Sequence, residues 1–186
     1  MKECPQTNNQ SVWQHGESVK SYLNDLLKHL IYKEKLQYNW KLPEWIYDPI
    51  FIRNIVCNLI DQYALYHDCG KPYCVEYTEG RRHFPNHAEV SYNVYKSVFE
   101  DGDCAELIRR DMDFHLLKSV DLQKFSEYKF ANILILSALA EIHSNAQMFA
   151  KDFDGNPLES IGFKIKWKHT NKRGRQVVEI IKNKNK

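Results

Sequence analysis

The feature that most constrains the fold of this 186-residue chain is the stretch FANILILSALA (130–140), which is apolar nearly all round. It predicts the first part of a helix over 130–150 that other elements cover on every side, because a helix with a solvent-facing side carries polar residues there. Glu141 follows directly within the same helix. An isolated buried carboxylate is costly, so a paired base or a bound cation is expected beside it.

Apolar residues at helical spacing predict an all-α bundle of five or more helices around this segment. The other helices are expected over 11–33, over 50–67, from an N-cap at Asn86 to about Phe99, and over 103–117. The connections are expected at 34–48 and at 73–85, where Gly80 and Pro85 favour a loop. Residues 1–158 are predicted to form one domain.

The C-terminal segment 159–186 differs in character and is predicted to be a short basic β-hairpin and tail packed on the same domain. FKIKWKH alternates strictly, NKRG can turn, and RQVVEII can return as a second strand. Lys164, Lys166 and Lys168 would then share one strand face and contact successive phosphates of a nucleic acid. The alternative is a solubilising edge strand protected by its lysines.

Composition is that of a globular protein, with 43% hydrophobic and 27% charged residues and a net charge of +2. No apolar run reaches the length of about 18 residues that a membrane span needs, and the first ten residues lack the apolar core of a signal peptide. A cytoplasmic location without a membrane partner is therefore expected. The five cysteines show no CxxC spacing, which favours free thiols.

Three histidines fall on the inward stripes of three different predicted helices. They are His15, His67 and His115, and Asp68 directly follows His67. Imidazole and carboxylate groups are suitable ligands for zinc, iron, manganese and similar cations. Each residue alone has an ordinary structural explanation, such as a hydrogen-bonded core histidine or a carboxylate capping a turn. Their common inward direction, together with that of Glu141, predicts a metal site.

The order of these residues resembles the HD superfamily of metal-dependent phosphohydrolases. The segment HDCGKP (67–72), followed by GRRHFPNHAEVSY (80–92), looks most like the HD domain carried by many CCA-adding tRNA nucleotidyltransferases. The resemblance covers roughly residues 11–150. It implies an HD-domain helical fold, with His15, His67 and Asp68 as core metal ligands. Glu141 stands where the family usually has aspartate, which is a departure by one methylene.

The resemblance also implies a second metal position, because His87 and His115 match the residues that bind a second ion in dinuclear members. One or two divalent ions are thus expected, of Mn, Fe, Ni, Co, Mg or Zn. Lys71 matches a lysine that lies near substrate phosphate. Arg81, Arg82 and His83, on the loop beside the expected site, are interpreted as phosphate-binding residues or as solvated charges.

The function that follows from the resemblance is hydrolysis of a phosphate ester of a nucleotide or of an RNA end, with a 2′,3′-cyclic phosphate as a plausible substrate. Asp68 and Lys71 are the expected catalytic residues. Two alternatives remain open at this point. One is a non-catalytic module that binds nucleotides or nucleic acid, and the other is a di-iron HD oxygenase using the same six ligands.

Overall fold

The computed structural model describes residues 1–7, 10–53, 55, 59–100, 102–150 and 153–184. It is mostly helical. The described residues contain one sheet, which is antiparallel and has two strands. The predicted all-α class is confirmed at this level. The chain divides into two compact units, which are described separately: unit 1 comprises Met1–Lys20 and Asn58–Met112, and unit 2 comprises Ser21–Cys57 and Asp113–Lys186. The predicted division of the chain at residue 158 stays a prediction.

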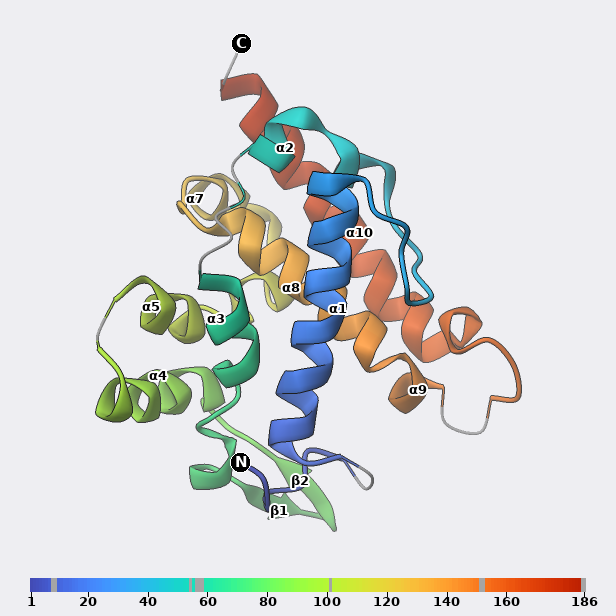
Figure 1. Cartoon of the computed structure of the whole chain (residues 1–186). Helices are drawn as coiled ribbons and strands as arrows, with labels where there is room; N and C mark the ends of the chain where they lie inside the picture. Colours follow the sequence, from blue (N-terminus) through green and yellow to red (C-terminus); the bar gives the residue numbers. More distant parts are fainter. Residues whose placement is uncertain (8–9, 54, 56–58, 101, 151–152, 185–186) are drawn as a thin grey trace. The chain divides into compact units, whose positions relative to one another are not determined.

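Unit 1 is built on three short helices and the beginning of a long one (Figure 1). Helix α3 (Ile60–Tyr66) and helix α4 (His87–Val98) each lie near α5 (Asp103–Arg109), and the first part of α1 (Val12–Tyr32) also belongs to this unit. Helix α1 meets α3 closely, because a Cβ atom at Gly16 would lie 2.5 Å from the carbonyl oxygen of Leu65. The glycine therefore sets how near the two helices approach.

A β-hairpin occupies part of the segment that was expected to be an irregular loop. Strands β1 (Glu76–Thr78) and β2 (Arg81–His83) pair antiparallel, with Thr78 opposite Arg81. Glu79 and Gly80 connect them, and both have positive φ angles, 51° and 73°. A two-residue connection in which both residues have positive φ angles matches the twist of the paired strands, which explains the glycine at position 80.

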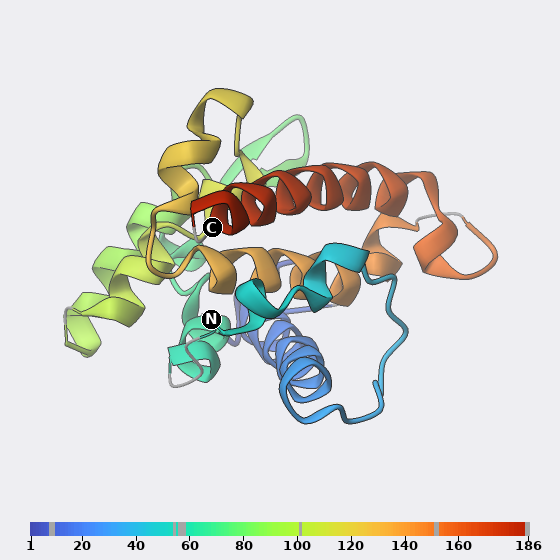
Figure 2. The same ribbon diagram turned by 90° about the horizontal axis from the view of Figure 1, so that it is seen from above.

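Unit 2 contains the second part of α1, the 3-10 helix η1 (Glu44–Tyr47) and the remaining helices, among which α8 (Ala131–Ser144) and α10 (Ile161–Lys184) are the longest. These two helices lie side by side, as seen in orange and red in Figure 2. Shorter helices complete the unit: α2 (Pro49–Arg53), α6 (Met112–His115, whose first residue belongs to unit 1), η4 (Ser119–Asp121), α7 (Leu122–Ser126), α9 (Ala146–Phe149) and η5 (Pro157–Glu159).

The predicted central helix is confirmed. Every residue of α8 is buried except Glu141 and Ser144. The buried Asn132 has a partner, since it donates its Nδ2–H to the carbonyl oxygen of Phe51 at 2.7 Å. This hydrogen bond ties the centre of unit 2 to helix α2 and removes the cost of a buried amide.

The predicted C-terminal β-hairpin is wrong, because residues 161–184 form the continuous helix α10. Over seven residues the alternation of FKIKWKH is compatible with a strand, but over the whole segment the buried residues recur at helical spacing. They are Phe163, Thr170, Gly174, Val177 and Val178. Gly174 was expected in a turn but lies within the helix. The Trp45 ring packs against it, and a Cβ atom at this position would lie 2.2 Å from that ring, so the position requires glycine.

Three other expected helices are interrupted. The prediction of one continuous helix over 50–67 is wrong, because Ile55, between α2 and α3, is not helical. Asn54 and residues 56–58 lie outside the described residues. The expected helix over 103–117 breaks between α5 and α6, and that over 130–150 breaks at Asn145. Buried apolar residues stand on both sides of each break, so apolar spacing alone does not reveal where one helix ends and the next begins.

No helix in the described part of the chain is both long and apolar enough to cross a lipid bilayer. The cysteines of that part, Cys4, Cys69, Cys74 and Cys104, are free thiols, as predicted, and Cys57 lies outside it.

Candidate metal centre

The centre of unit 1 is the turn that follows α3 and carries the HDCGKP segment. His67 is the C-cap of α3, with a φ angle of −52°, and Asp68 to Gly70 turn the chain into the 3-10 helix η3 (Lys71–Tyr73). Gly70 lies against α4, where its N–H donates to Ser91 Oγ at 2.9 Å. The turn is thereby fixed on the helix that begins with His87.

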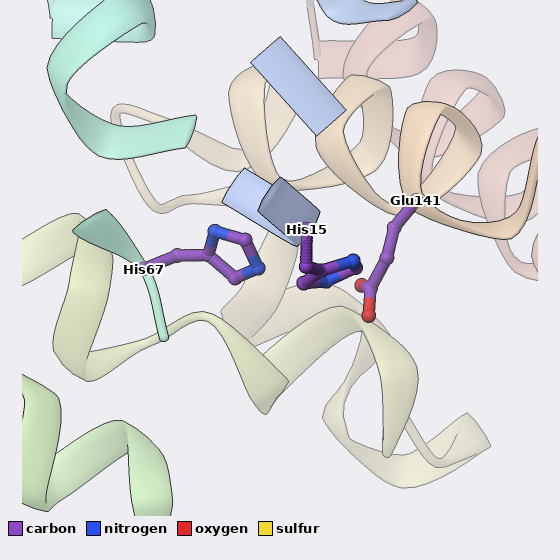
Figure 3. A group of neighbouring side chains, drawn as sticks. All are labelled: His15, His67 and Glu141. Atoms are coloured by element: carbon purple, nitrogen blue, oxygen red, sulfur yellow. The ribbon is translucent and has the colours of Figure 1, made fainter. Parts of the chain in front are cut away.

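Three imidazole rings from three helical segments surround the carboxylate of Asp68. The Nε2 atoms of His15 and His67 lie 3.5 and 3.4 Å from Asp68 Oδ2, and Nε2 of His87 lies 3.7 Å from Oδ1. The rings of His15 and His67 lie next to each other, with centroids 5.3 Å apart and planes inclined by 60° (Figure 3). His15, His67 and Asp68 are almost completely buried. Four of the predicted site residues are therefore brought together within unit 1.

Backbone hydrogen bonds fix which nitrogen of two of these rings faces Asp68. His67 Nδ1 lies 2.8 Å from the carbonyl oxygen of Ala64, and His87 Nδ1 lies 3.0 Å from that of Phe84. A carbonyl oxygen only accepts, so Nδ1 carries the hydrogen in both rings. Nε2 of each ring then faces Asp68: a protonated ring donates its Nε2–H to the carboxylate, and a neutral ring has there the lone pair that a cation would bind. The hydrogen bond at Nδ1 is the usual support of a metal-binding histidine.

Lys71 provides the positive charge nearest to Asp68. Its Nζ donates to Asp68 Oδ2 at 2.6 Å, and the lysine is 7% exposed. Burial by itself raises the pKa of the Asp68 carboxyl, but the Lys71 ammonium and the rings of His67 and His15 outweigh it and hold the pKa well below its usual range. Asp68 is thus an anion, as a metal ligand must be.

Asp111 belongs to the same cluster and was missed by sequence reasoning. Its carboxylate and the ligand atoms of Asp68 and His87 all lie within 4.8 Å of one another. Asp111 is buried, and Tyr63 donates its hydroxyl hydrogen to Asp111 Oδ1 at 2.6 Å. The sequence offered little indication of this, because Asp111 follows Arg109 and Arg110 within the helix expected over 103–117, and charged neighbours are typical of a surface position. Only its burial marks it as a candidate ligand.

The donor set fits a divalent cation by chemistry and by spacing. Ligand atoms that share one cation at about 2.1 Å lie roughly 3.0 to 3.4 Å apart, depending on the coordination geometry. The three Nε2 to carboxylate distances, 3.4, 3.5 and 3.7 Å, are close to this range. Imidazole with carboxylate suits zinc, iron, manganese, cobalt and nickel.

His115 and Glu141, the two remaining predicted ligands, lie in unit 2 and pair with each other. Glu141 extends from α8 (Figure 3), and its Oε2 is 2.8 Å from His115 Nε2. Both side chains are 23% exposed. Glu141 is therefore half-buried rather than fully enclosed, and the paired base expected beside it is a histidine. That either residue binds a metal stays a prediction.

The predicted phosphate-binding residues occupy different positions. Lys71 contacts Asp68 directly, whereas Arg81 and Arg82 lie on β2 of the hairpin. Arg81 is exposed, and Arg82 donates from Nη1 to the carbonyl oxygen of Pro5 at 2.9 Å. Their role in phosphate binding stays a prediction.

Comparison with known proteins gives no family for this chain. No protein-family model matches it, and neither does any curated protein or any solved structure.

Proposed function

We propose that unit 1 is an HD-type metal site and that the chain is a metal-dependent phosphohydrolase. The observation that supports this most is the convergence of three imidazole Nε2 atoms on the buried Asp68 carboxylate. His15, His67, Asp68 and His87 would hold the cation, with Asp111 as a further ligand. The proposed substrate is a phosphate ester of a nucleotide or an RNA end, including a 2′,3′-cyclic phosphate.

When bound, a divalent cation supplies Lewis acidity, which lowers the pKa of bound water to about 7 and polarises a phosphoryl oxygen. The side chains around it have their own tasks. Asp68 would bind the cation as an anion, and its carboxylate can accept a hydrogen bond from the attacking water and so orient it. The Lys71 ammonium, 2.6 Å from Asp68, offsets negative charge that develops on the phosphoryl group. The backbone carbonyls that bind His67 and His87 orient their rings.

The same lysine also supports the second candidate, a module that binds nucleotides or nucleic acid without catalysis. A buried ion pair between Lys71 and Asp68 neutralises the carboxylate without any other cation. In that case the imidazole cluster would be a polar core network. The two candidates differ in metal content, which can be measured directly.

The test is metal content and turnover of the purified chain. We expect metal to remain bound after dialysis, measured by plasma mass spectrometry. Hydrolysis of bis-p-nitrophenyl phosphate or of 2′,3′-cyclic nucleotides is expected with Mn, Fe, Ni, Co, Mg or Zn. Replacing a ligand should lower metal affinity by at least about 100-fold, since even supporting residues account for 10- to 100-fold. Asp68→Asn and His87→Gln are the two ligand variants.

His83→Gln is the matched control, because His83 is an exposed histidine on β2, four residues before His87. It should keep its metal, because His83 is not among the proposed ligands. Circular dichroism separates loss of a ligand from loss of the fold, and His87, which is only partly buried, is the less disruptive site. Unchanged metal content in both ligand variants, with no turnover of any phosphate ester, would overturn the proposal. Metal binding with oxygen consumption and without phosphate release would point to the oxygenase instead.

A further inference from the structure

A row of basic residues follows the exposed side of α10 in unit 2. Its members recur three, four or seven positions apart, which keeps them on one side of a helix. They are Lys164, Lys168, Lys172, Arg175 and Lys182. The residues that α10 buries, Phe163, Thr170, Gly174, Val177 and Val178, lie on another side of the helix, next to the basic row. We call the first set the basic row; Lys166 is not part of it, because it is rotated by about 200° from Lys164.

The middle of the basic row is not neutralised by neighbouring acids. Lys164 and Lys182 pair with Glu159 and Asp48, at 2.9 and 2.8 Å. In the part of the chain that the structure describes, Lys168, Lys172 and Arg175 form no ion pair or hydrogen bond through their side chains.

Like charges one turn apart on a helix repel each other, so this arrangement weakens the helix in isolation. Glu179 lies one turn beyond Arg175 without pairing with it. An anionic partner that crosses several turns would relieve the repulsion.

A groove of about 760 Å³ lies beside the basic row, between α10 and the segment around η1. Arg175 lines it together with the indole rings of Trp45 and Trp167, and the acidic residues Glu44, Asp48 and Glu179 also line it. Trp45 donates its Nε1–H to the carbonyl oxygen of Asn171 at 3.1 Å, and Trp167 donates to that of Lys41 at 2.7 Å. Both rings are therefore held in place before any partner arrives.

We propose that this face of unit 2 binds single-stranded nucleic acid. The phosphates would lie along Lys168, Lys172 and Arg175, and bases would pack in the groove against the tryptophans. Basic side chains that follow the backbone, with aromatic rings for the bases, are the combination that proteins use for single strands. An anionic membrane fits less well, because α10 buries its apolar side within unit 2 and keeps no wide apolar face to insert. The proposal does not depend on the metal centre.

The test is fluorescence anisotropy of a labelled twelve-nucleotide oligouridylate, with EDTA present so that the strand is not cleaved. Three neutralised phosphates predict a slope of about −2 in log affinity against log salt, since each contributes about −0.7 for a single strand. Affinity should therefore fall about 20-fold between 50 and 200 mM KCl. The triple variant Lys168→Gln/Lys172→Gln/Arg175→Gln should lose at least 10-fold in affinity at 50 mM and most of the salt dependence.

The matched control is Lys28→Gln/Lys35→Gln/Lys124→Gln, which removes the same charge from exposed positions of unit 2 outside the basic row. It should bind as the wild type does. All substitutions replace exposed lysine or arginine by glutamine, a good helix former, so the fold should persist. Equal loss in both triple variants, no binding at 50 mM KCl, or binding to phosphatidylserine vesicles but not to the oligonucleotide would each overturn the proposal.

Discussion

Replacing Gly70 by alanine tests whether the HDCGKP turn must lie directly against α4. Gly70 has an ordinary φ angle of −81°, so alanine meets no backbone strain there. Its Cβ, however, would lie 2.3 Å from the backbone nitrogen of Ser91, whereas ordinary contact begins at 3.4 Å. The turn and the helix must therefore separate by about 1 Å, because backbone atoms cannot rotate out of the way as a side chain can.

The magnitude follows from two costs. Overpacking of a tight contact costs about 1–3 kcal/mol. Stretching the buried hydrogen bond from Gly70 N–H to Ser91 Oγ, now 2.9 Å, adds about 1–2 kcal/mol. We expect a loss of about 2–5 kcal/mol in the free energy of unfolding. For a chain of this size, the corresponding drop in Tm is about 10 °C.

The assay is urea unfolding of the purified variant followed by circular dichroism. Gly102→Ala is the matched control, since Gly102 is extended and a Cβ atom there meets nothing within 4 Å. Because Gly102 is the N-cap of α5, where alanine is disfavoured, this control should lower the free energy of unfolding by no more than about 1 kcal/mol. If Gly70→Ala proves as stable as Gly102→Ala, the close approach of the turn to α4 is refuted. Metal content measured on the same samples should also fall in Gly70→Ala, because the turn carries Asp68.

Two further predictions concern buried polar residues of unit 2. Asp25→Ala should lower the free energy of unfolding in urea by about 2–4 kcal/mol. The reason is that the Asp25 carboxylate accepts hydrogen bonds from two backbone N–H groups and one indole N–H of segment 37–40. Asp25→Asn, which keeps an acceptor oxygen, should lower it by less. Burial lowers the pKa of His143 to about 4, and the ring is fixed in its neutral form by donating to Leu139 and accepting from the N–H of Lys41. The neutral ring therefore stabilises the fold above pH 6.5, and this contribution, about 3 kcal/mol, is lost as the pH falls from 6.5 toward 4. His143→Gln should abolish that part of the pH dependence of unfolding, and an unchanged dependence would contradict the assignment.

The sequence by itself determined the elements whose patterns are long or extreme. The apolar segment 130–140 is longer than most buried strands, so its length favoured a covered helix, whose backbone groups pair within the segment itself. The helix over 11–33 and the one that starts after Asn86 were likewise predictable, and they appear as α1 and α4. The inward direction of His15 and His67 followed from the same periodicity.

Tertiary structure decided what short patterns leave open. Alternation over seven residues favoured a strand at 163–169, but packing of Phe163 and Val177 on unit 2 selects a helix. Gly174 suggests a turn from the sequence alone, but in the structure it lies within a helix at the point where the Trp45 ring packs against it. Asp111 becomes a candidate ligand only through its burial and its position near Asp68 and His87. The physical reason is common to all three: local preferences amount to a fraction of a kcal/mol per residue, whereas burial of a large side chain or a charge amounts to several.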